Sequence, residues 1–185
     1  MISKKVIVLN GAPGAGKDTF RNLLANYVEF RKIDYKDILF HELFKDVSSI
    51  KIQWWLKNYK NGFKDQPQDE LNGLSMREVL IGFSENYIKP MKGVNFFAEE
   101  MVDRIKKAPS EVFVIADIGF QYELDALTNE NGFDVTLLRI DKQECNFDND
   151  SRCHLSYKNM GFLNNEGNLD DLENQAKFVK DYLKL

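Results

Sequence analysis

A run of small residues ending in a lysine stands near the start of the chain. Gly11-Ala-Pro-Gly-Ala-Gly-Lys17 has the spacing G-x-x-x-x-G-K. Small residues let backbone N–H groups turn inward around a phosphate, while the following helix directs its positive end at the same anion. Lys17 would add a mobile charge for the terminal phosphates of a nucleotide. We therefore expect a nucleotide site made by Gly11, Ala12, Pro13, Gly14, Ala15, Gly16, Lys17, Asp18 and Thr19.

Side-chain oxygens follow this turn and a later apolar run. Asp18 stands where the motif usually has Ser or Thr, and Thr19 comes next. Asp117 ends the apolar residues 112–116, a position where a carboxylate can hold Mg²⁺ through water or orient an attacking group. Asp18, Thr19 and Asp117 are therefore the candidate metal ligands. The alternative for Asp117 is a cap on the turn that precedes Gly119.

Three of the six arginines are candidates for binding phosphate. Phosphoryl transfer needs fixed positive forks on the donor and acceptor phosphates. Arg77, Arg139 and Arg152 come from a predicted helix start, a strand end and a loop, respectively. For each of them, a surface salt bridge is an equal alternative.

The elements around these residues alternate between strand and helix. Short β-branched runs predict buried strands at 6–9, 112–116 and 134–140, with weaker strands near 28–33 and 161–164. Helical spacing predicts helices at 18–29, 121–130 and from Asn168 to the end of the chain. This order predicts an α/β fold, a parallel sheet of about five strands with helices on both faces. Ligands of such sheets bind beyond the carboxyl ends of the strands, where the phosphate turn, Asp117 and Arg139 fall.

The stretch between the first and second strong strands reads as mostly helical. Apolar residues recur at helical spacing from Tyr35 to about Lys60, and residues 61–74 carry turn formers. Ser75 and Glu78 form a capping box, which predicts a helix that ends near Lys89, before Pro90. Another helix is expected over 93–106. We expect Trp54-Trp55 to pack in a core or lid, with base stacking as the alternative.

Composition limits the remaining functions. The 185 residues suit one domain, and 25 basic against 29 acidic residues give a net charge of −4. No broad basic surface is available for nucleic acid or membranes, and no apolar run exceeds five residues, whereas a membrane span needs about 20. A soluble, cytoplasmic protein is expected.

Cys145, Cys153 and His154 match no zinc or redox spacing and are expected to be two free thiols and a surface imidazole.

Several segments resemble known families. The phosphate turn looks like that of the adenylate-kinase-type nucleoside monophosphate kinases, and Gly16-Lys-Asp-Thr19 resembles that of phage deoxynucleoside monophosphate kinases. Three further segments are similar to the phage-type family: residues 76–85, residues 112–117 with Glu123, and residues 163–172. The resemblance covers the chain in patches and implies a single three-layer P-loop NTPase domain. That domain would carry a monophosphate-binding insertion at about 35–105 and a lid-like segment at about 141–160.

The resemblance also implies roles for single residues. Lys17, Asp117 and Arg152 would be catalytic, with Arg152 as the lid arginine that closes on the donor, and Arg139 would join the ATP site. Asp37, Arg77, Glu85 and Lys89 would bind the acceptor, although Asp34-Tyr-Lys-Asp37 matches the family's base site only loosely. Many members carry Arg where this chain has Gly119, so that contact is missing or supplied by Lys89 or Arg139. A homodimer, and the host cytoplasm for a phage-encoded protein, are implied by resemblance only.

The expected activity is transfer of the γ-phosphoryl group of Mg·ATP to a (deoxy)nucleoside monophosphate. A second hypothesis keeps the donor but changes the acceptor to another small phosphate or hydroxyl compound, as in phosphomevalonate kinases. A third is a protein that binds ATP without transferring a phosphoryl group. A GTPase switch would need Asn-Lys-x-Asp to read guanine, and this sequence has none.

Overall fold

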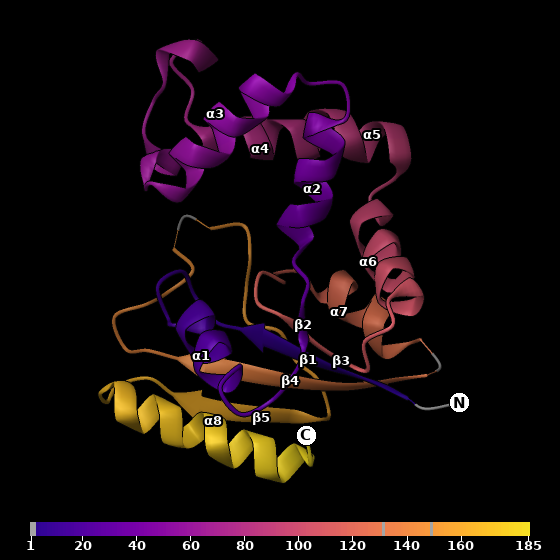
Figure 1. The fold of residues 1–185 in the computed structure, drawn as a ribbon, viewed down its shortest axis with the longest axis vertical. Helices are drawn as coiled ribbons and strands as arrows, with labels where there is room; N and C mark the ends of the chain where they lie inside the picture. Colours follow the sequence, from indigo (N-terminus) through magenta and orange to yellow (C-terminus); the bar gives the residue numbers. More distant parts are fainter. Residues whose placement is uncertain (1–2, 131, 149) are drawn as a thin grey trace. The chain divides into compact units, whose positions relative to one another are not determined.

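A computed structural model describes residues 3–130, 132–148 and 150–185 (Figure 1). The strands are β1 (Lys4–Asn10), β2 (Arg31–Lys32), β3 (Val112–Ile115), β4 (Phe133–Asp141) and β5 (Met160–Asn164). The α-helices are α1 (Lys17–Leu24), α2 (Tyr35–Phe44), α3 (Ser49–Lys60), α4 (Met76–Phe83), α5 (Lys89–Lys92), α6 (Phe96–Lys107), α7 (Gln121–Thr128) and α8 (Leu169–Leu183). Short 3₁₀ turns η1 (Phe63–Asp65) and η2 (Asp69–Leu71) and a π-turn η3 (Ser84–Ile88) complete the chain. None of the helices in the described part is long and apolar enough to cross a membrane.

The five strands form one parallel sheet in the order β2-β3-β1-β4-β5. Ile7 and Leu9 of β1 pack in one core cluster with Phe20 of α1 and Ala176 of α8. The alternate residues of β1, such as Val8, are also fully buried, and α7 packs against β4. Both faces of the sheet are therefore covered, and the predicted α/β class is confirmed. Burial on both faces is why these strands read as continuous apolar runs.

The backbone divides into two compact units. One unit contains Met1–Tyr35 and Met101–Leu185, and the other contains Lys36–Glu100. The first unit holds the sheet. The second has its own core, in which Trp55, Met76 and Leu80 are buried and neighbouring aromatic side chains pack around them. Trp55 is 6% exposed, so the packing interpretation of this tryptophan is confirmed.

Three predicted helix boundaries were wrong. The helix expected over 18–29 ends at Leu24, because the chain turns to bury Val28 in the sheet's core. The helix expected from Tyr35 to about Lys60 is divided into α2 and α3 by a turn between Phe44 and Ser49. The turn brings the ring centres of Phe40 and Tyr59 to 5.2 Å from one another. Helical spacing persists across such a turn, which is why periodicity missed it.

The helix that begins after Ser75 has the predicted capping box, but it does not stop before Pro90. Instead, α4 continues through the π-turn η3 into α5, where Pro90 occupies one of the first two positions. Proline is tolerated there because the first amides of a helix have no partner within it. The N–H of Lys89, the residue before Pro90, still donates to the carbonyl oxygen of Ser84 in the π-turn.

Candidate active site

The phosphate turn needs glycine at three positions, for two different reasons. Gly14 and Gly16 have φ angles of 80° and 99°, in the left-handed region that other residues rarely adopt. Gly11 has ordinary backbone angles, but a Cβ there would lie 2.5 Å from the carbonyl oxygen of Ile140. Residues 11–16 therefore follow a path that only this pattern of small residues allows.

Lys17 is folded back onto the turn. Its Nζ donates hydrogen bonds to the carbonyl oxygens of Gly11 at 2.5 Å and Ala12 at 2.9 Å. Burial lowers the pKa of Lys17 below its ordinary value, and the positive charge of Arg152 lowers it further. The ammonium group is thus held inside the turn beside a second cation, an arrangement that favours binding an anion.

Asp18 and Thr19 lie exposed in the first turn of α1. The Asp18 carboxylate accepts a hydrogen bond from Arg21 at 2.7 Å, and the same guanidinium donates to Asp34 at 2.6 Å. Arg21 and Asp34 are buried, at 6% and 5% exposure. Asp34 also accepts from the backbone N–H of Ala116 at 3.3 Å. A buried ion pair therefore connects the Asp18 carboxylate to the end of β3.

Asp117 lies two residues beyond Ile115, the last residue of β3, and is half-buried. Its Oδ1 accepts a hydrogen bond from the backbone N–H of Tyr35 at 2.9 Å. This partner belongs to the start of α2, so Asp117 does more than cap the turn before Gly119. After Asp150, the negative charge of Asp117 also contributes to raising the pKa of Arg152.

Arg152 fills the space beside Gly119. A Cβ at position 119 would lie 2.2 Å, 2.3 Å and 2.8 Å from the Cγ, Cδ and Cβ of Arg152, respectively. The guanidinium forms a two-pronged ion pair with Asp150, at 2.9 Å and 2.6 Å, and this hydrogen bonding is the main cause that raises its pKa. The chain thus places the side chain of Arg152 directly over Gly119.

Arg139 lies near the end of β4 as predicted. Its Nε donates to Asp141 at 2.8 Å, and its guanidinium lies 5.9 Å from the ring centre of Phe162. The salt-bridge alternative is therefore realised for Arg139, as it is for Arg152 with Asp150. A phosphate would have to compete with these carboxylates for the two cations.

The four predicted acceptor residues all belong to the second unit. Arg77 is exposed and pairs with Asp65 at 2.5 Å, while Lys89 donates to Glu85 at 2.6 Å. Asp37 is exposed in the first turn of α2. Arg77 therefore also forms the salt bridge that was its alternative, and Glu85 and Lys89 pair with one another one helical turn apart.

Two asparagines at the site were missed by the sequence analysis. Asn165 donates from Nδ2 to the carbonyl of Ala15 at 2.9 Å, and a Cβ on Gly16 would collide with the same amide. Asn10 is fully buried at the end of β1 and binds the chain around Leu155. Asn10 directly follows the apolar run 6–9, and this position was the signal. A side-chain amide at the end of a buried strand needs hydrogen-bond partners, so it is expected to bind a neighbouring segment.

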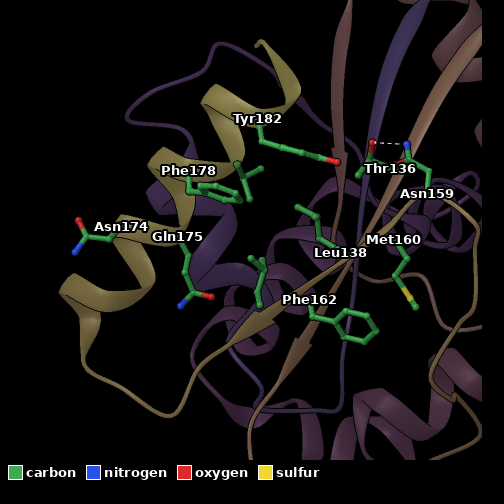
Figure 2. A pocket seen from close by; sticks show the side chains of 12 residues that line it. Thr136, Leu138, Asn159, Met160, Phe162, Asn174, Gln175, Phe178 and Tyr182 are labelled. Atoms are coloured by element: carbon green, nitrogen blue, oxygen red, sulfur yellow. Dashed lines mark hydrogen bonds between the residues drawn. The ribbon is translucent and has the colours of Figure 1, made fainter.

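Two cavities lie away from these residues. A cavity of about 430 Å³ lies between α8 and the strands β4 and β5, and Figure 2 shows Phe178 and Tyr182 of α8 on one side of it and Leu138 on the other. A second, of about 520 Å³, lies in the second unit beside Trp54. Neither is lined by a predicted site residue. The site that we describe therefore depends on charge and backbone geometry.

No protein-family model matches this sequence, and no curated protein matches it either. Solved structures do match along nearly the whole chain. One is described as "a putative kinase" from Chloroflexus aurantiacus, with a TM-score of 0.54 and 11% identity over 100% of this chain and 98% of that chain. The APS kinase CysC of Mycobacterium tuberculosis, solved with AMPPNP and APS, has a TM-score of 0.50 and 16% identity over both whole chains. A sugar kinase from Janibacter sp. has a TM-score of 0.50 and 16% identity over 97% of this chain and 95% of that chain.

At these identities the matches establish the fold. The chain shares with these structures a three-layer architecture, in which a parallel sheet is covered by helices on both faces. The predicted fold class is confirmed.

Proposed function

We propose that this chain is a phosphotransferase. It would transfer the γ-phosphoryl group of Mg·ATP to the phosphate of a nucleoside or deoxynucleoside monophosphate. One observation carries this proposal: Gly14 and Gly16 take left-handed backbone angles in the turn between β1 and α1, and Lys17 folds back onto that turn, where the charge of Arg152 lowers its pKa. The γ-phosphoryl group would leave the β-phosphate oxygen of ATP and bond to an oxygen of the acceptor phosphate. The products are ADP and a nucleoside diphosphate.

The described residues fit both ATP and Mg²⁺. Gly14 and Gly16 adopt backbone angles that let amide groups face a phosphate, and Lys17 supplies a cation. Asp18, Thr19 and Asp117 offer the oxygen ligands that Mg²⁺ prefers. Mg²⁺ usually keeps several waters and binds one or two protein side chains plus phosphates. Accordingly, no group of three or more His, Cys, Asp or Glu among the described residues forms an all-protein cage. When bound, Mg²⁺ would offset the charge on the phosphates.

The protein's own groups would act mainly by position and charge. Lys17 would exchange its two carbonyl partners for phosphate oxygens and follow the transferring group. Arg152 would exchange Asp150 for the donor phosphates, and Arg139 would add a second cation. Asp117 would orient the metal or the attacking oxygen. Phosphoryl transfer requires little covalent help, so these roles suffice.

For the acceptor we propose Arg77, Lys89 and Glu85, with Asp37 as a contact to the base. The support is the resemblance of residues 76–85 to the phage-type family and the charge of these side chains. Arg77 and Lys89 each have a carboxylate partner in the second unit that an acceptor phosphate would have to displace.

The second candidate keeps the ATP site and changes the acceptor to another phosphorylated or hydroxyl compound. It is favoured by the fold matches, since one structure is named an APS kinase and another a sugar kinase. Neither the phosphate turn nor Arg152 distinguishes these acceptors.

Release of ADP from Mg·ATP by the purified protein tests the proposal. The acceptor panel contains the ribo- and deoxyribonucleoside monophosphates, phosphomevalonate, adenosine 5′-phosphosulfate, simple sugars and a no-acceptor control. Turnover with one or a few nucleoside monophosphates supports the proposal and identifies the base. Turnover only with another compound selects the second candidate. ATP binding without ADP formation across the panel would show a nucleotide sensor.

A further inference from the structure

Asn10 joins the phosphate turn to the segment that carries Arg152. It is the last residue of β1, immediately before Gly11, and its side chain is fully buried. Its Nδ2 donates to the carbonyl oxygen of Cys153 at 3.1 Å, and its Oδ1 accepts from the N–H of Leu155 at 3.0 Å. Both halves of one amide therefore bind the backbone directly after Arg152.

Gly119 holds the same segment from the end of β3. Its carbonyl oxygen accepts a hydrogen bond from the N–H of Cys153 at 3.3 Å. Because Gly119 has no side chain, the aliphatic part of Arg152 can lie against it, in space that a Cβ would occupy. Leu155 is 1% exposed, so an apolar side chain fixes the segment as well.

These contacts bear on how the arginine can work. A long arginine side chain on a free loop must be ordered each time that it binds phosphate, which costs conformational entropy. Here residues 153 and 155 are bonded to Asn10 at the end of β1 and to Gly119 in the loop after β3, next to the turn that holds Lys17. The positive charge of Arg152 also lowers the pKa of Lys17, which is bonded to that turn.

We infer that Asn10 and Gly119 position Arg152 for the donor phosphates before ATP binds. Asn10 does so through its hydrogen bonds to residues 153 and 155, and Gly119 because it has no side chain. This inference rests on the proposed function and differs from the lid expected over 141–160, because the part of that segment nearest Arg152 is fixed to the sheet. Asn10 does not touch the reacting atoms. It acts through Arg152.

Asn10→Asp tests the inference with little change in shape. The carboxylate can still accept from Leu155, but its second oxygen faces the Cys153 carbonyl instead of donating to it. Gly119→Ala disturbs Arg152 from the opposite side and carries the test if the buried aspartate prevents folding. Asn159→Asp is a control for the same substitution at an exposed site away from the phosphate turn, where Asn159 donates to Val135 at 2.9 Å and Thr136 at 3.0 Å.

We expect Asn10→Asp and Gly119→Ala to lower kcat by about 10- to 100-fold, as a displacement of about 1 Å at a catalytic group does. The affinity for ADP should change less than about threefold, and Asn159→Asp should match the wild type. Combining Asn10→Asp with Arg152→Ala should be no worse than the more severe single variant, since both remove the same contribution. Fully multiplicative losses would overturn the inference.

A second readout does not depend on catalysis. Hydrogen exchange at the Cys153 amide, which bonds to Gly119, should quicken about tenfold or more in Asn10→Asp and stay unchanged in Arg152→Ala and Asn159→Asp. Unchanged exchange in Asn10→Asp would overturn the inference even if the enzyme is a kinase. If the wild type transfers phosphate to no acceptor, the proposed function fails. The inference is then decided by this exchange and by whether Asn10→Asp loses the same fraction of ATP affinity as Arg152→Ala.

Discussion

Each cation proposed to act on the donor phosphates already has a hydrogen-bond partner in the folded chain. Lys17 is bonded to two carbonyl oxygens, Arg152 to Asp150 and Arg139 to Asp141. These internal partners keep the like charges of Lys17 and Arg152 in adjacent positions without a bound anion. A nucleotide must therefore displace them, and the strength of ATP binding is a difference between two sets of polar contacts.

Replacing Lys17 by Met should separate activity from stability. Turnover should fall by about two to three orders of magnitude, as on removal of one charge-stabilising donor. The midpoint of thermal unfolding should not fall, because Met removes a charge that burial and Arg152 disfavour. Activity assays and calorimetry on the same sample check both outcomes. Substantial residual turnover would refute the role of Lys17.

The lowered pKa of Lys17 also has a pH consequence. Its pKa in the folded chain lies below the ordinary value of 10.5, so between these two pH values the unfolded chain binds more protons. The free energy of unfolding should therefore gain a favourable contribution from Lys17 as the pH rises through that window. Lys17→Met should lack this contribution. Urea unfolding of both proteins from pH 8 upward measures it, and parallel pH profiles would contradict the assignment.

Asp150 competes with ATP for Arg152. Asp150→Asn should tighten ATP binding about fivefold, equivalent to about 1 kcal/mol, because the neutral amide releases the guanidinium but can still accept from the N–H of Arg152. Titration calorimetry with ATP measures the change. Weaker binding would show that Asp150 orients Arg152 more than it competes for it.

At the scale of elements, the ends of helices and strands decide where side chains are presented. The capping boxes at Ser75 and Asn168 start α4 and α8 at the residues where they were predicted. These signals are local and hold in any tertiary setting. In contrast, α1 ends early and α2 separates from α3 because side chains distant in the sequence are buried together. Periodicity contains no record of such turns.

Two serines at helix starts give a matched test of capping. Ser75→Ala should lower the free energy of unfolding by about 1 kcal/mol, because the Ser75 hydroxyl accepts from the N–H of Glu78 at 3.2 Å. Ser48 occupies the same position before α3 but makes no such hydrogen bond with its side chain. Ser48→Ala should therefore cost less than about 0.5 kcal/mol. Equal losses in chemical denaturation would remove the capping box as the cause.

At the scale of the molecule, the buried pair of Arg21 and Asp34 connects α1 to the segment that leads out of β2. The pair brings Asp18, Asp34 and the N–H of Ala116 into one hydrogen-bonded network. Burial alone would lower the pKa of Arg21, but hydrogen bonding to Asp34 and its charge outweigh burial, so the pKa is raised. The carboxyl end of the sheet is thereby held together by charge as well as by apolar packing.

Breaking that pair should be costly to the whole first unit. Arg21→Met should lower the free energy of unfolding by about 3–5 kcal/mol, because the charge of Asp34 stays buried without Arg21 to balance it. Lys107→Met removes the exposed pair with Asp103 and should cost less than about 1 kcal/mol. Urea denaturation compares the two variants. A loss for Arg21→Met no larger than that for Lys107→Met would show that water reaches the pair.

The amino-acid sequence by itself determined the phosphate turn, the strands around it and the helix starts at Ser75 and Asn168. Each of these depends on local backbone sterics or on apolar periodicity, which a sequence displays directly. Only the tertiary structure decided which side chains meet there: Arg152 against Gly119, Asn10 on the segment 153–155, and Arg21 between Asp18 and Asp34. Those contacts join residues up to 145 positions apart, and their strength comes from burial that folding creates.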